Sequence, residues 1–239
     1  MSPEPPVALI TGASRGLGRH TALVFARAGY RVSICGRKEH DLAFVAREIV
    51  SAGGEARCRA LDVRDHHALE SWVGDALGTW GRIDVLVNNA GLSSSFRPLV
   101  EWTRDQVDET LDVNIKGTVY ACQAVLPSMY SRRSGHILNI SSDVGRRPVP
   151  NMAPYVAAKH AVVGFSGSLY REAREHNVKV TVVLPGIIDT HFGGAKPGDR
   201  DMHWTMNTEH VAEALLQIVR QPGNLTFDEV TLHPLGQDF

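Results

Sequence analysis

The 239-residue sequence predicts a single α/β domain: a doubly wound, seven-stranded, mostly parallel sheet with helices on both faces. Short apolar runs rich in β-branched residues alternate with longer amphipathic segments along the chain. Several short runs are almost continuously apolar, as is typical of parallel strands that are covered on both faces. Neither a linker nor a shift in composition divides the chain, so we expect one domain over residues 1–239.

The predicted strands and helices alternate in order. Strands are expected at residues 7–10, 31–35, 57–62, 83–88, 136–141, 179–184 and 227–232. Helices are expected at residues 15–28, 38–52, 65–79, 104–131, 153–176 and 208–220, with a break in the fourth helix near Asn114. Glycines such as Gly29 and Gly81 stand between these segments, where they end helices. Right-handed crossovers then bring the carboxyl ends of the strands to one edge of the sheet.

Composition and charge exclude several classes of partner. The formal net charge is −1, so neither a nucleic acid nor an anionic membrane is the expected main partner. Cys35, Cys58 and Cys122 are scattered, and the histidines show no metal-ligand spacing, so we expect neither disulfides nor a metal. No apolar run approaches the ~18–20 residues of a membrane span, and the first residues lack the pattern of a signal peptide. A soluble, cytoplasmic protein is expected.

A glycine-rich stretch, T-G-A-S-R-G-L-G, directly follows the first predicted strand and opens a helix. Gly12 permits a sharp turn, and the missing side chains at Gly16 and Gly18 let a phosphate and the sheet come close. The helix terminus then offers free N–H groups and a positive dipole end to a pyrophosphate. The spacing is not that of Gly-x-Gly-x-x-Gly, and a tight strand–helix connection is the alternative interpretation. The residues expected to bind a dinucleotide here are Gly12, Ser14, Arg15, Gly16, Leu17 and Gly18.

The end of the second strand indicates which dinucleotide is bound. An NAD enzyme carries an acid here for the ribose, whereas this chain has Gly36 followed by Arg37. Arg15 and Arg37 together can clamp a 2′-phosphate, so the predicted cofactor is NADP(H). The alternative is that both are surface arginines. Asp62, at the end of the third strand, is expected to accept a hydrogen bond from the adenine amino group or to cap the next helix.

Tyr155 and Lys159 are four residues apart in a predicted helix, and therefore one turn apart on one face. A lysine ammonium held there favours the phenolate and is expected to lower the tyrosine pKa toward neutrality. Such a phenol can do acid–base work near neutral pH. The alternative is a solvated helix face, because this spacing alone is common.

Taken with the glycine-rich loop, this pair makes the sequence similar to the short-chain dehydrogenase/reductase family, which has a Rossmann-type fold. The resemblance runs from Val7 to about Leu232. Ser142 lies thirteen residues before Tyr155, the family's usual separation for the serine that binds the reacting oxygen. Asn114 matches the family asparagine whose helix distortion holds a water in the proton relay. Further residues that the resemblance places at the cofactor are Val63, Asn89, Ala90, Gly91, Tyr155, Lys159, Pro185, Gly186, Ile188 and Thr190.

The resemblance implies a short-chain, NADP-dependent dehydrogenase or reductase that moves a hydride between the nicotinamide and a carbonyl or secondary alcohol. Tyr155 would be the acid or base, Ser142 would bind the reacting oxygen, and Lys159 and Asn114 would complete a proton relay. A 3-oxoacyl-thioester reductase and a catalytically silent NADP-binding regulator are the alternatives. Family members commonly form homodimers or homotetramers, so association is expected.

The substrate is expected beyond the carboxyl ends of the strands, with a loop at about 187–207 beside it. The glycine-rich residues 192–199 within this loop resemble a mobile lid. A small to medium carbonyl or alcohol compound fits the modest length of these loops. The candidate substrate residues are Ser93, Phe96, Val144, Met152, Ile187, His191 and Trp204.

Overall fold

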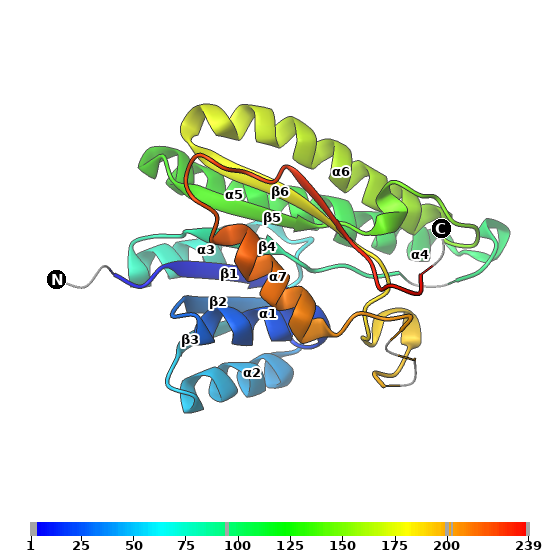
Figure 1. Ribbon diagram of the computed structural model, residues 1–239, viewed down its shortest axis with the longest axis horizontal. Helices are drawn as coiled ribbons and strands as arrows, with labels where there is room; N and C mark the ends of the chain where they lie inside the picture. The colour runs from blue at the N-terminus through cyan, green and yellow to red at the C-terminus, as the bar shows by residue number, and fades with distance from the viewer. Residues whose placement is uncertain (1–3, 94–95, 199–200, 202, 238–239) are drawn as a thin grey trace.

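A computed structural model describes residues 4–93, 96–198, 201 and 203–237 (Figure 1). Its strands are β1 (Val7–Thr11), β2 (Arg31–Gly36), β3 (Glu55–Ala60), β4 (Val85–Asn88), β5 (Gly135–Ile140), β6 (Val178–Pro185) and β7 (Glu229–Leu232). Its α-helices are α1 (Gly16–Arg27), α2 (Glu39–Ser51), α3 (His66–Trp80), α4 (Arg104–Leu111), α5 (Gly117–Arg132), α6 (Ala153–Ala173) and α7 (Thr208–Val219). All predicted strands and helices are therefore present, with ends shifted by a few residues.

The strands form one sheet in the order β3-β2-β1-β4-β5-β6-β7. Every neighbouring pair is parallel, so the sheet that was predicted to be mostly parallel is entirely so in the described chain. The strand order reverses between β1 and β4. In doubly wound sheets, ligands bind outside the carboxyl ends of the strands at such a switch point.

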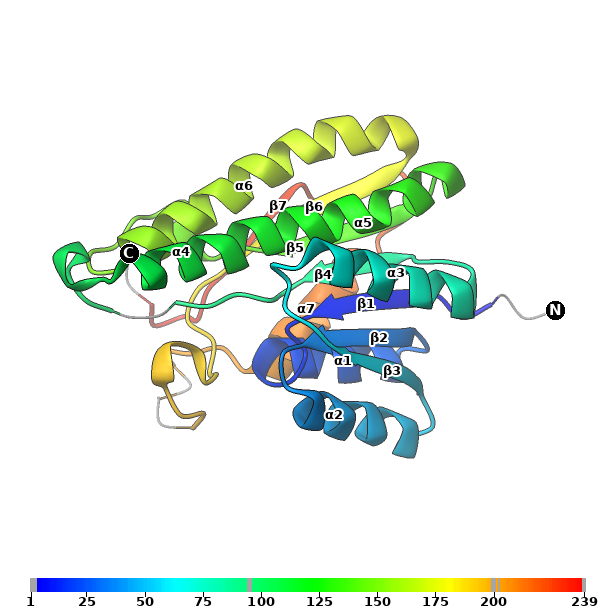
Figure 2. The same ribbon diagram turned by 180° about the vertical axis from the view of Figure 1, so that it is seen from behind.

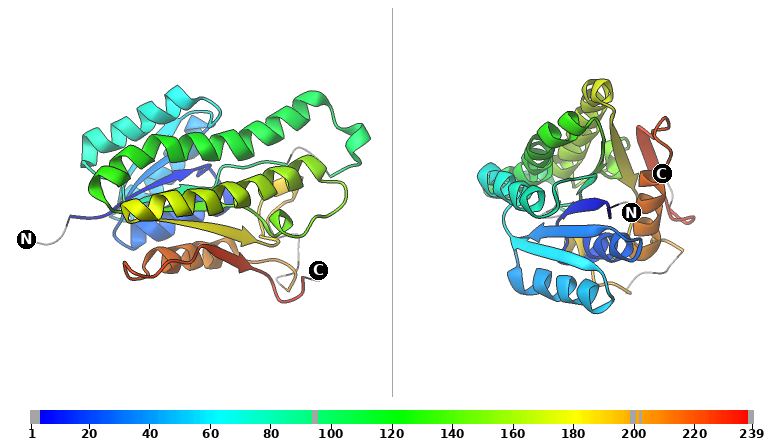
Figure 3. Two further views of the ribbon diagram at one scale, coloured as in Figure 1. Left: turned by 90° about the horizontal axis from the view of Figure 1, so that it is seen from above. Right: turned by 90° about the vertical axis from the view of Figure 1, so that its left-hand side faces the viewer.

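Helices cover both faces of the sheet, as Figures 2 and 3 show. Successive strand residues point to opposite faces, so Leu9 packs in the cluster with α3 and α5, whereas Ile10 packs with α1, α2 and α7. In β4, Leu86 likewise packs in the cluster with α3 and α5, and Val87 packs with α1, α2 and α7. Burial on both faces explains the continuously apolar strands of the sequence.

The predicted break near Asn114 is a single π-helical turn, Asp112–Lys116, that joins α4 to α5. Asn114 lies in this turn and is fully buried. An inserted π-turn leaves local backbone groups out of the regular α-helical pattern, and such turns concentrate at functional sites. Among the described residues, no helix combines the length and the apolar character that a bilayer crossing requires.

Candidate active site

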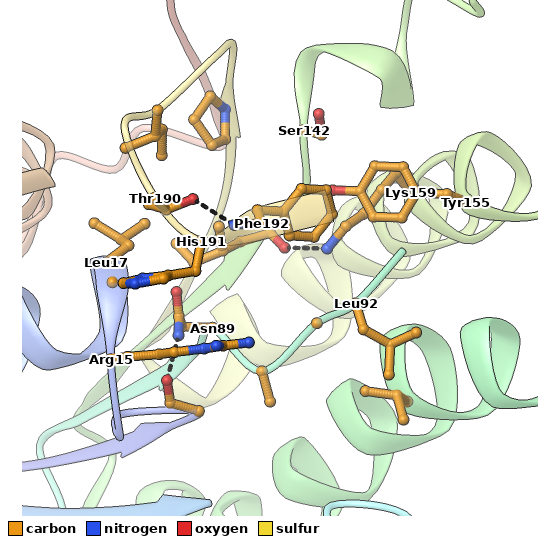
Figure 4. Close-up of a pocket in the computed structure, with 18 of the residues that line it drawn as sticks. Arg15, Leu17, Asn89, Leu92, Ser142, Tyr155, Lys159, Thr190, His191 and Phe192 are labelled. Carbon is orange, nitrogen blue, oxygen red and sulfur yellow. Dashed lines mark hydrogen bonds between the residues drawn. The ribbon is translucent and has the colours of Figure 1, made fainter. Parts of the chain in front are cut away.

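A cavity of about 610 Å³ opens at the carboxyl edge of the sheet (Figure 4). Loops that follow β1, β2, β4, β5 and β6 line it, so residues far apart in sequence meet here. Among the predicted cofactor residues, it is lined by Gly12, Ser14, Arg15, Gly16, Leu17, Arg37, Asp62, Val63, Asn89, Ala90, Gly91, Tyr155, Lys159, Pro185, Gly186, Ile188 and Thr190. The cavity extends from the glycine-rich loop to the Tyr155–Lys159 pair.

The loop after β1 is shaped by close backbone contacts. Gly12 has φ +66°, and a Cβ on it would lie 2.8 Å from the Cα of Ala90. A Cβ on Gly18 would collide with the carbonyl oxygen of Gly12, so Gly18 lets helix α1 pack against the loop rather than lining the cavity. These glycines are thus required by the geometry of the turn.

The loop is also tied to the strand beside it. The Asn89 side-chain amide donates to the carbonyl oxygens of Thr11 and Gly12, both at 3.1 Å. The Thr11 hydroxyl accepts from the backbone N–H groups of Asn89 and Ala90 at 3.1 and 3.0 Å. Thr11 was not among the predicted site residues, because a threonine at a strand end carries no distinctive sequence signal.

The amino end of α1 faces the cavity. Its N-cap residue, Arg15, makes no side-chain capping bond, and the first turn contains no acidic residue. The first N–H groups of a helix have no partner within the helix, and together with the helix dipole they favour an anion. A pyrophosphate fits this end of the cavity, since the glycines leave space for it and Arg15 adds a positive charge.

Arg37 and Asp62 border the same end of the cavity, but each is engaged by a neighbour. The Arg37 side chain is 61% exposed and its Nη1 lies 3.3 Å from Oε1 of Glu109. Asp62 binds the guanidinium of Arg64, and these hydrogen bonds lower the pKa of its carboxyl. The suggestion that Asp62 caps the next helix is wrong, because Asp65 caps α3 by accepting from the N–H of Ala68 at 3.0 Å.

Tyr155 and Lys159 lie one turn apart on α6 and are both buried, with 6% and 4% of their surface exposed. The Lys159 ammonium donates to the carbonyl oxygen of Ile140 at 3.0 Å. Its nitrogen lies 5.5 Å from the centroid of the Tyr155 ring. Figure 4 shows the two side chains pointing into the cavity from the same helix. The solvated helix face considered for this pair is therefore excluded.

The predicted direction of the Tyr155 pKa shift is wrong. Burial raises the pKa of the phenol above its usual value, the hydrogen bond with Ser142 opposes this, and the nearby charge of Asp143 raises it further. Burial also lowers the pKa of Lys159 to about 8. Sequence spacing indicated the neighbouring charge, but removal of both groups from water has the larger effect. Tyr155 is consequently a protonated phenol at neutral pH.

Two adjacent serines follow β5, and their surroundings separate their roles. The Ser141 hydroxyl is buried and donates to the carbonyl oxygen of Lys159 at 2.9 Å, so it joins β5 to α6. The Ser142 hydroxyl lies beside Tyr155, and its hydrogen bond opposes the rise of the tyrosine pKa. Ser142 is therefore the serine placed to contact a reacting oxygen.

Asn114 stands behind the cavity lining. Its amide nitrogen donates to the carbonyl oxygens of Leu92 and Thr110 at 2.7 and 2.8 Å. Its buried Oδ1 has no hydrogen-bond partner among the described residues. A Cβ on Gly91 would lie 2.8 Å from this Oδ1 and 3.4 Å from Lys159 Nζ, so both polar atoms border the space beside Gly91.

Residues 6–201 match the family model described as short chain dehydrogenase. The chain belongs to the short-chain dehydrogenase/reductase family. An uncharacterized oxidoreductase of Staphylococcus saprophyticus is 35% identical to it over 97% of this chain and 98% of the relative. The chain is an oxidoreductase of this family, and the family fold explains the position of the cavity.

Solved structures of the family are similar over almost the whole chain. An alcohol dehydrogenase from the archaeon Thermococcus sibiricus, complexed with 5-hydroxy-NADP, has a TM-score of 0.93 and 32% identity, covering 98% of this chain and 99% of its own. A serine dehydrogenase in its closed form, complexed with NADP⁺, has a TM-score of 0.90 and 30% identity, covering 98% and 96%.

The end of the cavity beside Tyr155 is mainly apolar. Phe192, which belongs to the predicted substrate loop but was not singled out as a substrate residue, has its ring centroid 5.2 Å from that of Tyr155 (Figure 4). Of the predicted substrate residues, those that line the cavity are Phe96, Val144, Met152, Ile187 and His191. Ser93 and Trp204 are not among the lining residues, and the ring of Trp204 packs edge-on against His203.

The described part of the predicted lid is folded. Residues Phe192–Gly194 form a 3₁₀ turn, and the N–H of Gly198 donates to both carboxylate oxygens of Asp189 at 3.0 and 2.9 Å. Residues 199, 200 and 202 of the predicted substrate loop lie outside the described residues. Across the part of the chain that the structure describes, no cluster of metal-ligating side chains is found.

Proposed function

We propose that the protein is an NADP(H)-dependent reductase or dehydrogenase that moves a hydride between the nicotinamide and a carbonyl or secondary alcohol. The observation that carries this proposal is the convergence of Ser142, Tyr155 and Lys159 on one cavity whose other end is the glycine-rich loop. Asn114 borders the space beside Gly91 together with Lys159, and its Oδ1 has no hydrogen-bond partner among the described residues. A silent binding protein has no need of all four groups in this arrangement.

The residues at the loop end fit a dinucleotide phosphate. The amino end of α1 offers its N–H groups to the pyrophosphate, and Arg15 and Arg37 provide the positive charge that a 2′-phosphate requires. At the end of β2, where an NAD enzyme carries an acid, this chain has Gly36 followed by Arg37, which favours NADP(H) over NAD(H). The NADP-type ligands in the two similar structures support the same choice. When bound, this cofactor supplies or receives the hydride.

Tyr155 is the proton donor in the reductive direction. Its raised pKa keeps the phenol protonated at neutral pH, which is the form that can hand a proton to a carbonyl oxygen as that oxygen gains electrons. Ser142, whose one hydroxyl proton is donated to Asp143 in this structure, would turn that proton to the same oxygen and stabilise its developing negative charge. Lys159 and Asn114 lead from Tyr155 toward the space beside Gly91, through which the phenol is reprotonated.

The apolar substrate end favours a small to medium, uncharged carbonyl compound. Val144, Met152 and Phe192 supply apolar contacts around the Tyr155 ring, and Phe96 lines the same cavity. A 3-oxoacyl thioester on a carrier would require a basic entrance. The candidates for that entrance are Arg97, Arg146 and Arg147. Of these, Arg146 is bound to both carboxylate oxygens of Glu229, which weakens this alternative.

The test is a screen for NADPH oxidation over aldehydes, ketones, diketones, 3-oxoacyl thioesters and sugars, repeated with NADH. We expect turnover with an uncharged ketone or aldehyde, and a preference for NADPH. Tight NADPH binding without turnover of any compound would contradict the proposal and support the silent regulator. Turnover of thioesters alone would support the acyl-thioester reductase.

A further inference from the structure

The segment that follows β7, drawn in red in Figure 1, returns to the carboxyl edge of the sheet. There its residue Gln237 lines the cavity. Gln237 forms a bridge with both ends of its side-chain amide. The nitrogen Nε2 donates to Oδ2 of Asp143 at 2.5 Å, and the oxygen Oε1 accepts from the N–H of Ile187 at 3.0 Å. Gly186 permits this approach, because a Cβ there would collide with Oε1 of Gln237.

Asp143 is the other half of this bridge. Its side chain is only 11% exposed, although it carries a carboxylate. Oδ1 accepts from the Ser142 hydroxyl at 2.9 Å and from the N–H of Val144 at 2.8 Å. Oδ2 receives Gln237, with His233 Nε2 at 3.9 Å. A carboxylate in these surroundings is stabilised by the donors around it, so each hydrogen bond also holds it in one orientation.

The two residues thus connect three parts of the site that are distant in sequence: the loop after β5, the turn after β6 and the segment after β7. We propose that Asp143 and Gln237 are positioning residues that set the Ser142 hydroxyl and the turn at residues 185–187 for hydride transfer. This inference rests on the proposed function, since Ser142 acts only if the cavity performs that reaction. The alternative is that the bridge only anchors the segment after β7.

A reciprocal exchange tests the bridge. Asp143→Asn leaves two arrangements. If the new amide nitrogen faces Nε2 of Gln237, two donors oppose each other. If the amide turns round, its nitrogen faces the Ser142 hydroxyl, which then loses its acceptor. In Gln237→Glu, two carboxylates face each other. The double variant restores the bridge with donor and acceptor exchanged. The introduced amide nitrogen at position 143 donates to the introduced carboxylate at position 237, and that carboxylate still accepts from the N–H of Ile187. The amide oxygen at position 143 still accepts from Ser142 and Val144.

We expect each single variant to lose about tenfold or more in kcat and the double variant to recover to within about threefold of the wild type. KM for NADPH should change much less than kcat, because the turn at residues 185–187 is only one part of the cofactor site and the loop at Gly12–Gly18 is untouched. Gln217→Glu, an exposed exchange of the same kind on α7, is the matched control and should leave both constants unchanged. Additive losses in the double variant would overturn the proposal.

Thermal unfolding without cofactor provides a readout that is independent of turnover. We expect each single variant to lower Tm by about 4 °C or more, and the double variant to regain most of the loss. Recovery of Tm without recovery of kcat would show an anchor only and would overturn the positioning role. If the wild type turns over no compound, both the proposed function and the positioning role are refuted. If the wild type is active but the double variant does not recover kcat, only the positioning role is refuted.

Discussion

The buried ammonium of Lys159 predicts an unusual dependence of stability on pH. Burial lowers its pKa from 10.5 to about 8. Because a tenfold change in proton affinity corresponds to ~1.4 kcal/mol, keeping this group charged costs the folded state roughly 3–4 kcal/mol. Replacing Lys159 with Met removes that cost while retaining most of the side-chain volume, although it also removes the hydrogen bond to Ile140.

The sign follows from the protons that each state binds. Between pH 8 and pH 10.5 the unfolded chain still holds the Lys159 proton that the folded chain has released. The stability of the wild type therefore rises with pH through this window, relative to Lys159→Met. From pH 7 to pH 9.5 the difference in unfolding free energy between the two proteins should change by about 2 kcal/mol in favour of the wild type. Contributions that do not depend on pH cancel in this comparison.

The assay is urea unfolding of both proteins, without cofactor, at pH 7 and pH 9.5. Lys196→Met is the matched control, because Lys196 is exposed and its ammonium stays in water in both states. Its stability difference from the wild type should be the same at both pH values. If the Lys159→Met difference also stays constant, the ammonium is not buried as described and the reasoning is refuted.

Three further predictions concern the proton donor, the cofactor and the loop. Tyr155→Phe should reduce turnover by about a thousandfold or more and leave NADPH binding intact, and near-normal activity would exclude Tyr155 as the donor. Arg37→Asp should weaken NADPH binding far more than NADH binding, whereas Glu109→Gln, which removes the ionic partner of Arg37, should strengthen NADPH binding. Titrations that follow cofactor fluorescence measure both effects. If Arg37→Asp weakens the binding of the two cofactors equally, Arg37 does not contact the 2′-phosphate. Gly18→Ala should abolish cofactor binding, because the added methyl group collides with the Gly12 carbonyl oxygen. Gly74→Ala, in open space on α3, should instead raise the free energy of unfolding by about 1 kcal/mol. Cofactor titration and urea unfolding measure the two effects, and normal cofactor binding by Gly18→Ala would contradict the close packing.

The fold could be predicted because its signals are local: apolar strands in alternation with helices predicted the parallel sheet. The π-turn was foreseen as a break at Asn114 for the same reason. Ser142 and Asn114 were proposed from the family resemblance, through the family's thirteen-residue separation from Tyr155 and its asparagine motif, and the structure places Ser142 and Tyr155 beside one cavity.

The rest depends on packing, which short sequence patterns do not contain. The bridge from Asp143 to Gln237 joins residues 94 positions apart, and neither has a motif around it. The Tyr155 pKa was predicted in the wrong direction because spacing shows the neighbouring charge but not the loss of water. The helix cap was assigned to Asp62 as one of two options, although Asp65 forms it, because both acids stand near the helix start.

The most direct test of the proposed reaction is a single-turnover measurement with a responsive ketone and NADPH that carries deuterium at both C4 positions, comparing the wild type with Tyr155→Phe. We expect deuterium on the carbinol carbon of the product with the wild type, and little or no product with the variant although it binds the cofactor. Deuterium transfer at equal rates in both proteins would contradict Tyr155 as the proton donor. Product without deuterium would contradict hydride transfer itself.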